Sequence, residues 1–465
     1  MARWTARTSL VHYEDRLPGL GAWSTVGGVA EAPRPPTNGA MNTLLACDAP
    51  AHDWYRFVLS FPPHLVRDYA GRFELADDAV VLDPFCGTGT TLVEAKKMGI
   101  AGIGVEAMPM AKFAAQVKTD WEPDPDGLAN HANLVAEKAL ASLTADGLSD
   151  ELGVPTRENQ QLRSLDSDAA KLLIKDSISP LPLHKALVLR EALDGERAAG
   201  FTDHEQLAFA RVLPTEVGNL RFGPEVGVGS LRDDAAVVAL WLNRVLTIAD
   251  DLRILGAQER TSAMVVPGDA RDVASCVPVE SVDAVITSPP YPNEKDYSRT
   301  VRLESVLLGY LTDRPSLRST KRELLRSNTR GVYRDDDDSA WVADDERVQD
   351  LATQIEERRI ALGKDSGFER MYHRVTKLYF GGMTRHLSSL RDVLRPGARL
   401  AYVVGDQASY LRVMIRTGQI LADIAERAGY EVEGIDLFRT RPATATRDQL
   451  REEVLLLRWP GPRGR

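Results

Sequence analysis

The segment DPFCGTGTT, from Asp83 to Thr91, places a glycine-rich turn between an apolar run and a helix-like stretch. Glycine lets a ligand come close to the backbone, and the amides at a helix start face such a ligand. The spacing DxFxGxG differs from the GxGxxG of dinucleotide binders, and no lysine precedes the threonines as in a P-loop. A plain tight turn is the alternative. We expect a ligand other than NAD or ATP on Asp83, Phe85, Cys86, Gly87, Thr88, Gly89, Thr90 and Thr91.

Two carboxylates follow later apolar runs. Glu106 comes after the run Ile100–Val105, about 20 residues beyond the glycine turn, where α/β nucleoside sites place a carboxylate that accepts from the ribose hydroxyls. Taken alone, Glu106 is simply a strand-end carboxylate. Asp269, followed by Ala270 in the segment GDARD, is predicted to accept from the exocyclic amine of an adenine. Three strand ends would then converge on one adenosine.

The segment TSPPY, Thr287–Tyr291, is the most specific pattern in the chain. Its two prolines cannot donate ladder hydrogen bonds, so the segment must leave the sheet after the run Val282–Ile286. It presents the Ser288 hydroxyl, the Pro289 carbonyl and the Tyr291 ring. A hydroxyl and a carbonyl together can hold an amino group, while an aromatic face stacks on the attached base.

A parallel sheet must position these motifs. The runs Ala79–Leu82 and Ile100–Val105, with a helical stretch between them, predict a β-loop-α-β unit of an α/β fold. Further strands are predicted at Ala263–Val266, Val282–Ile286 and Leu400–Val404. The closing segments GYEVEGIDLF and EEVLLLRW predict an antiparallel hairpin at the edge of the sheet.

Together, DPFCGTGTT, Glu106, GDARD and TSPPY resemble the motif series of the S-adenosylmethionine-dependent DNA amino-methyltransferases, the N4-cytosine/N6-adenine group. Further segments that resemble this family are FPPHLVRDYAGRF, YPNEKDYSRTVRLESVLLGYL, LRDVLRPGARLAYVVGDQ and REEVLLLRW. The resemblance covers roughly residues 53–120, 263–310 and 373–460. It implies a Rossmann-like methyltransferase fold with helical insertions. It also implies S-adenosyl-L-methionine as cofactor and double-stranded DNA as partner, and a cognate restriction endonuclease is a further candidate partner.

In that family, a serine at the first position of the tetrapeptide is typical of N4-cytosine enzymes, and Asp or Asn of N6-adenine enzymes. Ser288 therefore favours the N4 amine of a flipped cytosine, with a catalytic set of Ser288, Pro289, Pro290 and Tyr291. Two alternatives are methylation of adenine N6 in DNA and methylation of guanine N2 in RNA. A catalytically idle regulatory subunit and an NAD(P) oxidoreductase are disfavoured by the intact TSPPY and the missing GxGxxG.

The insertions depart from the compact family pattern, and the cofactor motifs precede TSPPY, whereas many SPPY enzymes are permuted. We expect an arm over residues 1–52, a catalytic domain over 53–120 with 261–309 and 373–465, a helical insertion over 121–260 and a charged insertion over 310–372. Either insertion is a candidate for target recognition. The loop Gly218–Ser230 with Arg221 is one candidate reader.

The charge is unevenly distributed. The 57 Lys+Arg against 67 Asp+Glu give a net charge of −10, which argues against a uniformly basic protein that coats nucleic acid. Residues 295–334, however, hold 10 Lys+Arg against 4 acids, a local net of +6, while residues 121–260 have a net of −9. Phosphate contacts are therefore expected just after TSPPY, from Arg299, Arg302, Arg318, Arg322 and Arg326.

The three cysteines lie far apart without a CxxC pair, which argues against a disulfide framework and a zinc ribbon, and no metal is expected. The first residues lack the apolar core of a signal peptide. No run approaches the roughly 18–20 apolar residues of a membrane span. We expect a cytoplasmic protein without a membrane partner.

Overall fold

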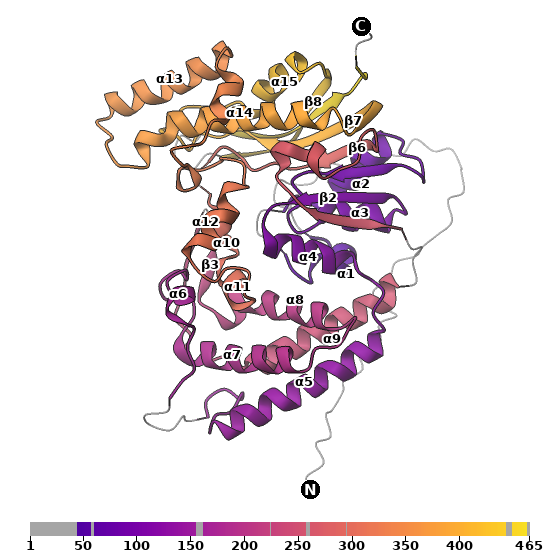
Figure 1. Ribbon diagram of the computed structural model, residues 1–465, viewed down its shortest axis with the longest axis vertical. Coiled ribbons are helices and arrows are strands. Elements are labelled where there is room, and N and C mark those ends of the chain that lie inside the picture. Colours follow the sequence, from indigo (N-terminus) through magenta and orange to yellow (C-terminus); the bar gives the residue numbers. More distant parts are fainter. Residues whose placement is uncertain are drawn as a thin grey trace. The chain divides into compact units, whose positions relative to one another are not determined.

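A seven-stranded, mostly parallel sheet organises the chain (Figure 1). The computed structural model describes residues 44–56, 60–154, 161–223, 225–256, 261–293, 295–442 and 449–462. The strand order is β5-β2-β1-β6-β7-β9-β8, and the strands are β1 (Val80–Asp83), β2 (Ala101–Glu106), β5 (Ala263–Pro267), β6 (Val282–Thr287), β7 (Leu394–Gly405), β8 (Glu431–Pro442) and β9 (Gln449–Arg458).

Five strands run parallel, from β5 through β2, β1 and β6 to β7. The last two form an antiparallel hairpin, in which β9 lies between β7 and β8 and is antiparallel to both. The α/β class, the parallel sheet and the closing hairpin predicted from the sequence are confirmed. Because the parallel strands share one direction, their carboxyl ends meet along one edge of the sheet.

Alternate residues of the strands face opposite layers of helices, as the two-residue period of a strand requires. On one face, Val81 and Ala284 pack with α2 (Pro63–Arg72) and α3 (Thr90–Lys97). On the other face, Leu82 and Val285 pack with α14 (Tyr372–Leu390) and α15 (Thr417–Arg427). The remaining helices against the sheet are α4 (Pro109–Thr119) beside β5 and α13 (Glu346–Ala361) beside α14.

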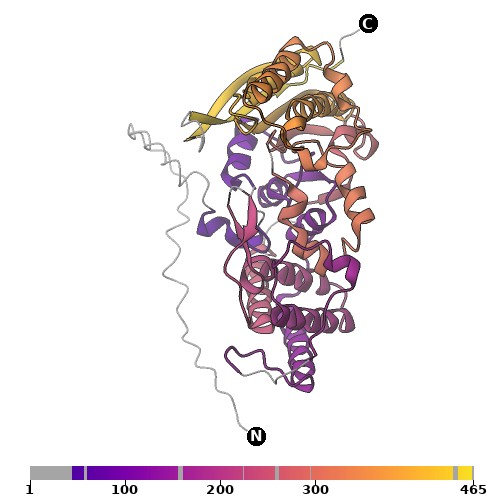
Figure 2. The ribbon, with the colours of Figure 1, turned by 90° about the vertical axis from the view of Figure 1, so that its left-hand side faces the viewer.

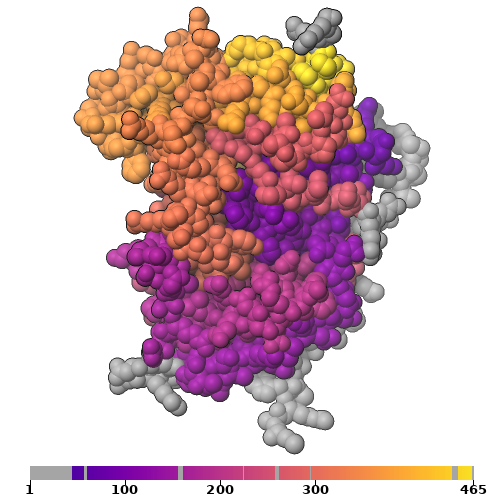
Figure 3. Space-filling model, viewed as in Figure 1, coloured from indigo at the N-terminus to yellow at the C-terminus, as the bar shows by residue number. Residues whose placement is uncertain are grey.

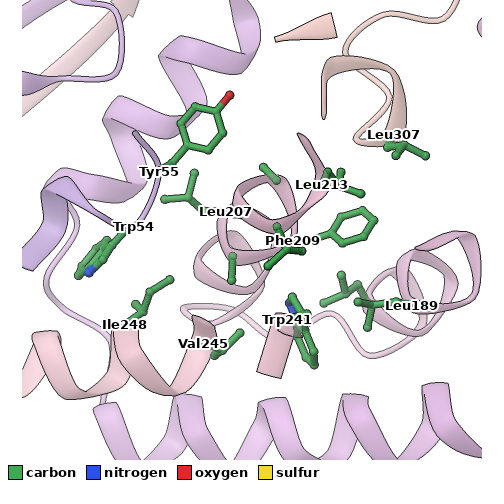
Figure 4. Close-up of a cluster of buried hydrophobic side chains, with 14 of the residues drawn as sticks. Trp54, Tyr55, Leu189, Leu207, Phe209, Leu213, Trp241, Val245, Ile248 and Leu307 are labelled. Carbon is green, nitrogen blue, oxygen red and sulfur yellow. The ribbon is translucent and has the colours of Figure 1, made fainter. Parts of the chain in front are cut away.

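A second core lies among helices between β2 and β5 in the chain. These helices are α5 (Pro125–Ala145), α7 (Pro180–Gly195), α8 (Thr202–Val212) and α9 (Val237–Leu255). The short helix α6 (Ser167–Ala170) packs instead in a smaller cluster with Val306 and Leu311. Trp241 is fully buried among Leu189, Phe209 and Val245 (Figure 4), and its indole nitrogen donates to the Glu205 carbonyl at 2.9 Å. Residues 121–260 are thus mainly helical, as predicted, while the division of the chain into domains stays a prediction.

The segment from Ala46 to His52, assigned to the arm, forms a 3-10 turn (Ala46–Asp48) and the short helix α1 (Ala49–His52). Ala51 is buried in the helical core, so the described end of the arm is packed. Residues 1–43 lie outside the described chain. No helix of the described ranges is both long and apolar enough to cross a membrane.

The loop Gly218–Ser230 forms a small two-stranded sheet of β3 (Leu220–Phe222) and β4 (Val226–Val228). In Figure 2, its pink ribbon rises from the helices toward the sheet. The stretch after β6 holds α10 (Tyr297–Thr300), α11 (Arg302–Leu307) and α12 (Arg314–Arg322). In the space-filling view, the orange part of this stretch lies against the magenta helical segment (Figure 3), and Leu303 and Leu307 are buried in the helical core.

Short turns complete the described structure. They are 3-10 turns at Ala270–Ser275, Thr329–Gly331, Asp338–Val342 and Glu369–Met371 and a π turn at Leu213–Val217.

Candidate active site

A cleft of about 730 Å³ opens at the carboxyl ends of β1, β2, β5 and β6. It brings together motifs that lie up to two hundred residues apart in the chain. The predicted residues that line it are Phe85, Cys86, Gly87, Thr88, Thr90, Glu106, Ala270, Ser288, Pro289, Pro290, Tyr291 and Arg326. Predicted residues outside its lining are Asp83, Gly89, Thr91, Asp269, Arg299, Arg302, Arg318 and Arg322.

Asp83 lies beneath the glycine turn and ties it to β6. Its carboxylate accepts from the Thr287 hydroxyl at 2.6 Å, from the Thr91 hydroxyl at 2.7 Å and from the Phe85 amide at 3.1 Å. Burial raises the pKa of Asp83 to about 6, and the three hydrogen bonds oppose that rise. The carboxylate therefore joins the glycine turn to β6, the strand that leads into TSPPY.

The glycine turn depends on close packing against β2 and α4. Gly89 has φ +84°, and a Cβ there would lie 3.0 Å from the Ala115 side chain. A Cβ on Gly104 would lie 2.5 Å from the Cys86 sulfur, so Cys86 fills the space above a glycine of β2. Burial raises the pKa of the Cys86 thiol well above its ordinary value, which is typical of an inert cysteine.

Lys118 supports the same turn from below. Its ammonium is fully buried and donates to the Thr88 carbonyl at 2.8 Å. Burial lowers the pKa of Lys118 to about 7. The neighbouring Thr88 hydroxyl is buried and has no hydrogen-bond partner among the described residues. A buried, unpaired hydroxyl in a cleft is a polar group that a ligand could satisfy.

Glu106 extends from the end of β2 into the cleft. Its two oxygens accept from the backbone amides of Gly87 and Met108, each at 2.7 Å. Burial raises the pKa of Glu106 to about 7. Each carboxylate oxygen has a further lone pair, so the group can still accept from ligand hydroxyls. Its position agrees with the ribose contact expected from the sequence.

Asp269 has a different environment from the one expected. Its carboxylate accepts from the Arg271 amide at 2.9 Å and from the guanidinium of Arg271, with a shortest distance of 2.6 Å. Arg271 also pairs with Asp338 at 2.5 Å, which anchors the segment after α12 to the sheet. Gly268 and Ala270 line the cleft on either side of Asp269. The two neighbours of Asp269, rather than Asp269 itself, therefore line the cleft.

TSPPY leaves β6 and forms one wall of the cleft. The Ser288 hydroxyl donates to the Val403 carbonyl of β7 at 3.1 Å, which leaves its oxygen lone pairs to accept. The Tyr291 ring lies against Gly405, where a Cβ would come within 2.9 Å of it. Burial and the nearby Glu452 raise the pKa of the Tyr291 phenol, which stays neutral. The ring is thus fixed in position by the backbone of β7.

The five arginines predicted to contact phosphate fall into three groups by their exposure. Arg302 and Arg326 are buried: Arg302 donates to the Ser298 carbonyl, and Arg326 pairs with Asp336 at 2.8 Å. Arg318 and Arg322 are exposed. Arg299 is half-buried, with its Nε atom buried and unpaired among the described residues. Two of the five arginines thus serve the protein interior, which a count of charges could not reveal.

The cleft also contains residues that the sequence reading did not select. Phe61 and Pro62 precede the glycine turn, and Gly223 and Glu225 lie at the tip of the β3–β4 hairpin. Lys295 follows TSPPY, while Arg439, Arg441 and Glu452 belong to the β8–β9 hairpin. The resemblance of FPPHLVRDYAGRF to a cofactor-side segment was the one signal for Phe61 and Pro62. Gly223 and Glu225 lie in the loop Gly218–Ser230, named above as a candidate reader, and Lys295 belongs to the basic stretch 295–334. Nothing in the local pattern of the β8–β9 hairpin pointed to Arg439, Arg441 or Glu452.

Comparison with known proteins identifies similar sequences. The model of the DNA methylase family N6_N4_Mtase matches residues 56–116. The chain is 24% identical to "Type II methyltransferase M.BsoBI" of Geobacillus stearothermophilus, over 85% of this chain and 81% of that protein. It is 23% identical to "Type II methyltransferase M.AvaI" of Nostoc sp., over 88% of this chain and 87% of that protein. These matches extend through parts of the insertions, beyond the segments that carry the motifs.

A shorter match joins the chain to "Type II methyltransferase M.MjaII" of Methanocaldococcus jannaschii, with 38% identity over 14% of this chain and 12% of that protein.

Proposed function

We propose, from the premise that the chain belongs to the N4/N6 DNA amino-methyltransferase family, that it methylates the exocyclic N4 amine of a cytosine flipped out of double-stranded DNA. The observation that carries this proposal is the shared cleft. Ser288, the Pro289 carbonyl and Tyr291 line the same cleft as Gly87 and Glu106, so a group that holds a base faces a group that holds a nucleoside.

The residues of the cleft fit S-adenosylmethionine. The unpaired Thr88 hydroxyl and the backbone of Gly87 offer polar contacts, and Glu106 offers carboxylate oxygens to a ribose. Phe85 and Ala270 line the cleft with apolar surface suited to an adenine. When bound, S-adenosylmethionine supplies a methyl group on a sulfonium, an activated donor that requires neither a metal nor a covalent nucleophile.

The protein's contribution would be orientation. A cytosine amine is conjugated with its ring and is a poor nucleophile, and in a duplex it is also paired, so the base must leave the stack. Ser288 and the Pro289 carbonyl would accept hydrogen bonds from the amine and favour a pyramidal nitrogen. Tyr291 would stack on the ring, held in place by Gly405. Positioning and electrostatics of this kind would supply most of the acceleration.

Similarity over most of the chain to proteins named Type II methyltransferases supports a place in a restriction-modification system. The proposal therefore includes a cognate restriction endonuclease as partner. Ser288 supports cytosine N4 over adenine N6, because serine at this position is typical of the N4 enzymes in the family.

The test uses labelled S-adenosylmethionine and unmethylated double-stranded DNA, followed by mass spectrometry of the nucleosides. We expect N4-methylcytosine from the wild type. The double variant Ser288→Ala with Tyr291→Ala should lose methyl transfer at least about a hundredfold while still binding the cofactor. Arg458→Gln, a change at the other end of β9 from the cleft, is the control and should retain activity.

Two results would overturn parts of the proposal. Full activity of the double variant would remove TSPPY from the chemistry. N6-methyladenine in the DNA, or a product found only with RNA, would replace the proposed acceptor.

A further inference from the structure

Three basic side chains form one wall of the cleft, and none of them is among the five arginines selected from the sequence as phosphate contacts. Lys295 lies four residues after Tyr291, while Arg439 and Arg441 lie on β8. All three line the cleft. Because Arg439 and Arg441 are two residues apart on a strand, their side chains leave the same face of the hairpin. We name Lys295, Arg439 and Arg441 the cationic wall.

One carboxylate partly neutralises the cationic wall. Glu452 of β9 is the cross-strand partner of Arg439 and accepts from its Nε at 2.6 Å. The same carboxylate lies 3.2 Å from the Nε of Arg441. Lys295 has no ion pair within the described part of the chain. Three positive charges against one negative charge leave a net local charge of +2.

This excess of positive charge lies in a partly buried place. The side chains of Arg439 and Glu452 are only 18% and 10% exposed, whereas Arg441 is 41% exposed. Burial and the nearby Arg441 lower the pKa of Lys295, while Glu452 opposes that change. Uncompensated cations are costly in such surroundings unless an anion joins them. The cationic wall therefore has the electrostatics of a site for a second anion.

The unused donors suit a phosphate. Each guanidinium approaches Glu452 through its Nε, and within the described ranges the terminal nitrogens of Arg439 and Arg441 have no hydrogen-bond partner. A planar guanidinium with free donors binds phosphate oxygens in a fork. The wall also adjoins Tyr291, since Glu452 and Arg441 both act on the pKa of its phenol. A nucleotide stacked on Tyr291 would bring its own backbone phosphates to this side.

Building on the proposed function, we propose that Lys295, Arg439 and Arg441 bind a DNA backbone phosphate adjacent to the flipped nucleotide, and that Glu452 serves as their counter-ion while DNA is absent. The phosphate then competes with Glu452 for the two guanidinium groups. If the phosphate competes with Glu452, loss of the Glu452 charge should tighten DNA binding. If the ion pairs only hold the hairpin together, loss of that charge should weaken DNA binding instead.

The experiment uses a duplex that carries the position methylated by the wild type, and measures its dissociation constant by fluorescence anisotropy over a range of salt concentrations. Each phosphate contact contributes about 0.9 to the slope of log K against log salt. Lys295→Gln, Arg439→Gln and Arg441→Gln should each weaken binding several-fold and flatten the slope. Glu452→Gln should tighten binding, whereas Arg458→Gln, on the same strand, should change neither quantity.

A second measurement locates the contact. A neutral methylphosphonate placed beside the target nucleotide should weaken binding by the wild type and have no further effect on Arg441→Gln. Weaker binding by Glu452→Gln, or unchanged slopes in all three cation variants, would overturn the inference while the wild type still methylates DNA. Absence of DNA methylation by the wild type would instead overturn the proposed function, and this inference with it.

Discussion

At the scale of single residues, Glu106 accepts two backbone hydrogen bonds and has a raised pKa. Burial raises its pKa to about 7 from 4.5, so the carboxylate is formed only as the pH rises through neutrality. The ionised group accepts from ribose hydroxyls at both oxygens, whereas the protonated group has lost acceptor capacity. We expect the affinity for S-adenosylmethionine to rise with pH through about 7, approaching tenfold per pH unit below it.

Isothermal titration calorimetry of the wild type and Glu106→Gln on either side of pH 7 checks this expectation. The variant should bind more weakly at high pH and lose the pH dependence in this window. A pH profile that persists in Glu106→Gln would contradict the expectation and point to Lys118, whose pKa is also about 7.

Single residues also show what the sequence could reveal. The glycine turn, Glu106 and TSPPY were selected because backbone constraints leave a clear pattern, and they line one cleft. Asp83 and Asp269 were also expected at the ligand, and their carboxylates accept hydrogen bonds from Thr287 and Arg271, so their contact with a ligand stays a prediction. Residue type shows that a carboxylate needs a partner. Only the tertiary arrangement decides which partner it finds.

At the scale of elements, α12 carries a row of arginines with two different roles. Arg318 and Arg322, together with Arg326 after the helix, are spaced by four residues, and each guanidinium lies over the Tyr333 ring at 4.9–5.5 Å. Arg326 is buried against Asp336, so Arg326→Gln should lower the free energy of unfolding by about 3–5 kcal/mol. Arg318→Gln should lower that free energy by no more than about 1 kcal/mol, the size of an exposed cation–π contact, and flatten the salt dependence of DNA binding by about 1 in slope.

Urea unfolding and anisotropy titrations of the two variants separate these roles. Wild-type stability of Arg326→Gln would contradict the structural role, and unaltered DNA binding by Arg318→Gln would remove this face of α12 from the DNA interface. The sequence showed the charge excess of residues 295–334 but could not show which guanidinium groups are buried.

The strands of the main sheet were easier to predict than the β3–β4 hairpin. The five parallel strands were found from short apolar runs, because both faces of such strands are buried. The β3–β4 hairpin has strands of only three residues and was read as a loop, yet Gly223 and Glu225 at its tip line the cleft. Three residues are too few to establish a two-residue period, so its structure could not be predicted.

At the scale of the whole molecule, one buried hydrogen bond joins two distant parts of the chain. Tyr55, which precedes α2, donates to Glu304 of α11 at 2.8 Å. Burial raises the pKa of Glu304 to about 7 from 4.5, so ionisation opposes folding. The resulting loss of folding stability is absent below about pH 4.5, grows between about pH 4.5 and 7, and reaches its full size above about pH 7.

Above pH 7, Glu304→Gln should therefore have a higher free energy of unfolding than the wild type, by on the order of 1–3 kcal/mol. The difference should disappear near pH 4.5. Urea unfolding across this pH range measures it. Tyr55→Phe serves as the comparison, because it removes the donor and should destabilise the protein at every pH. A Glu304→Gln variant whose relative stability is independent of pH would contradict the raised pKa.

The Asp83 carboxylate has a consequence for how the proposed activity would meet its DNA substrate. It binds Thr91 and Thr287, which belong to the first turn of α3 and to the end of β6. The floor of the cleft is therefore held by hydrogen bonds that form when the chain folds. Its walls come from other elements, among them the β3–β4 and β8–β9 hairpins, whose residues Glu225 and Arg441 line the cleft. Under the proposed function, DNA binding would select a prepared geometry instead of assembling one, and changes of target sequence would arise in these walls without disturbing the floor.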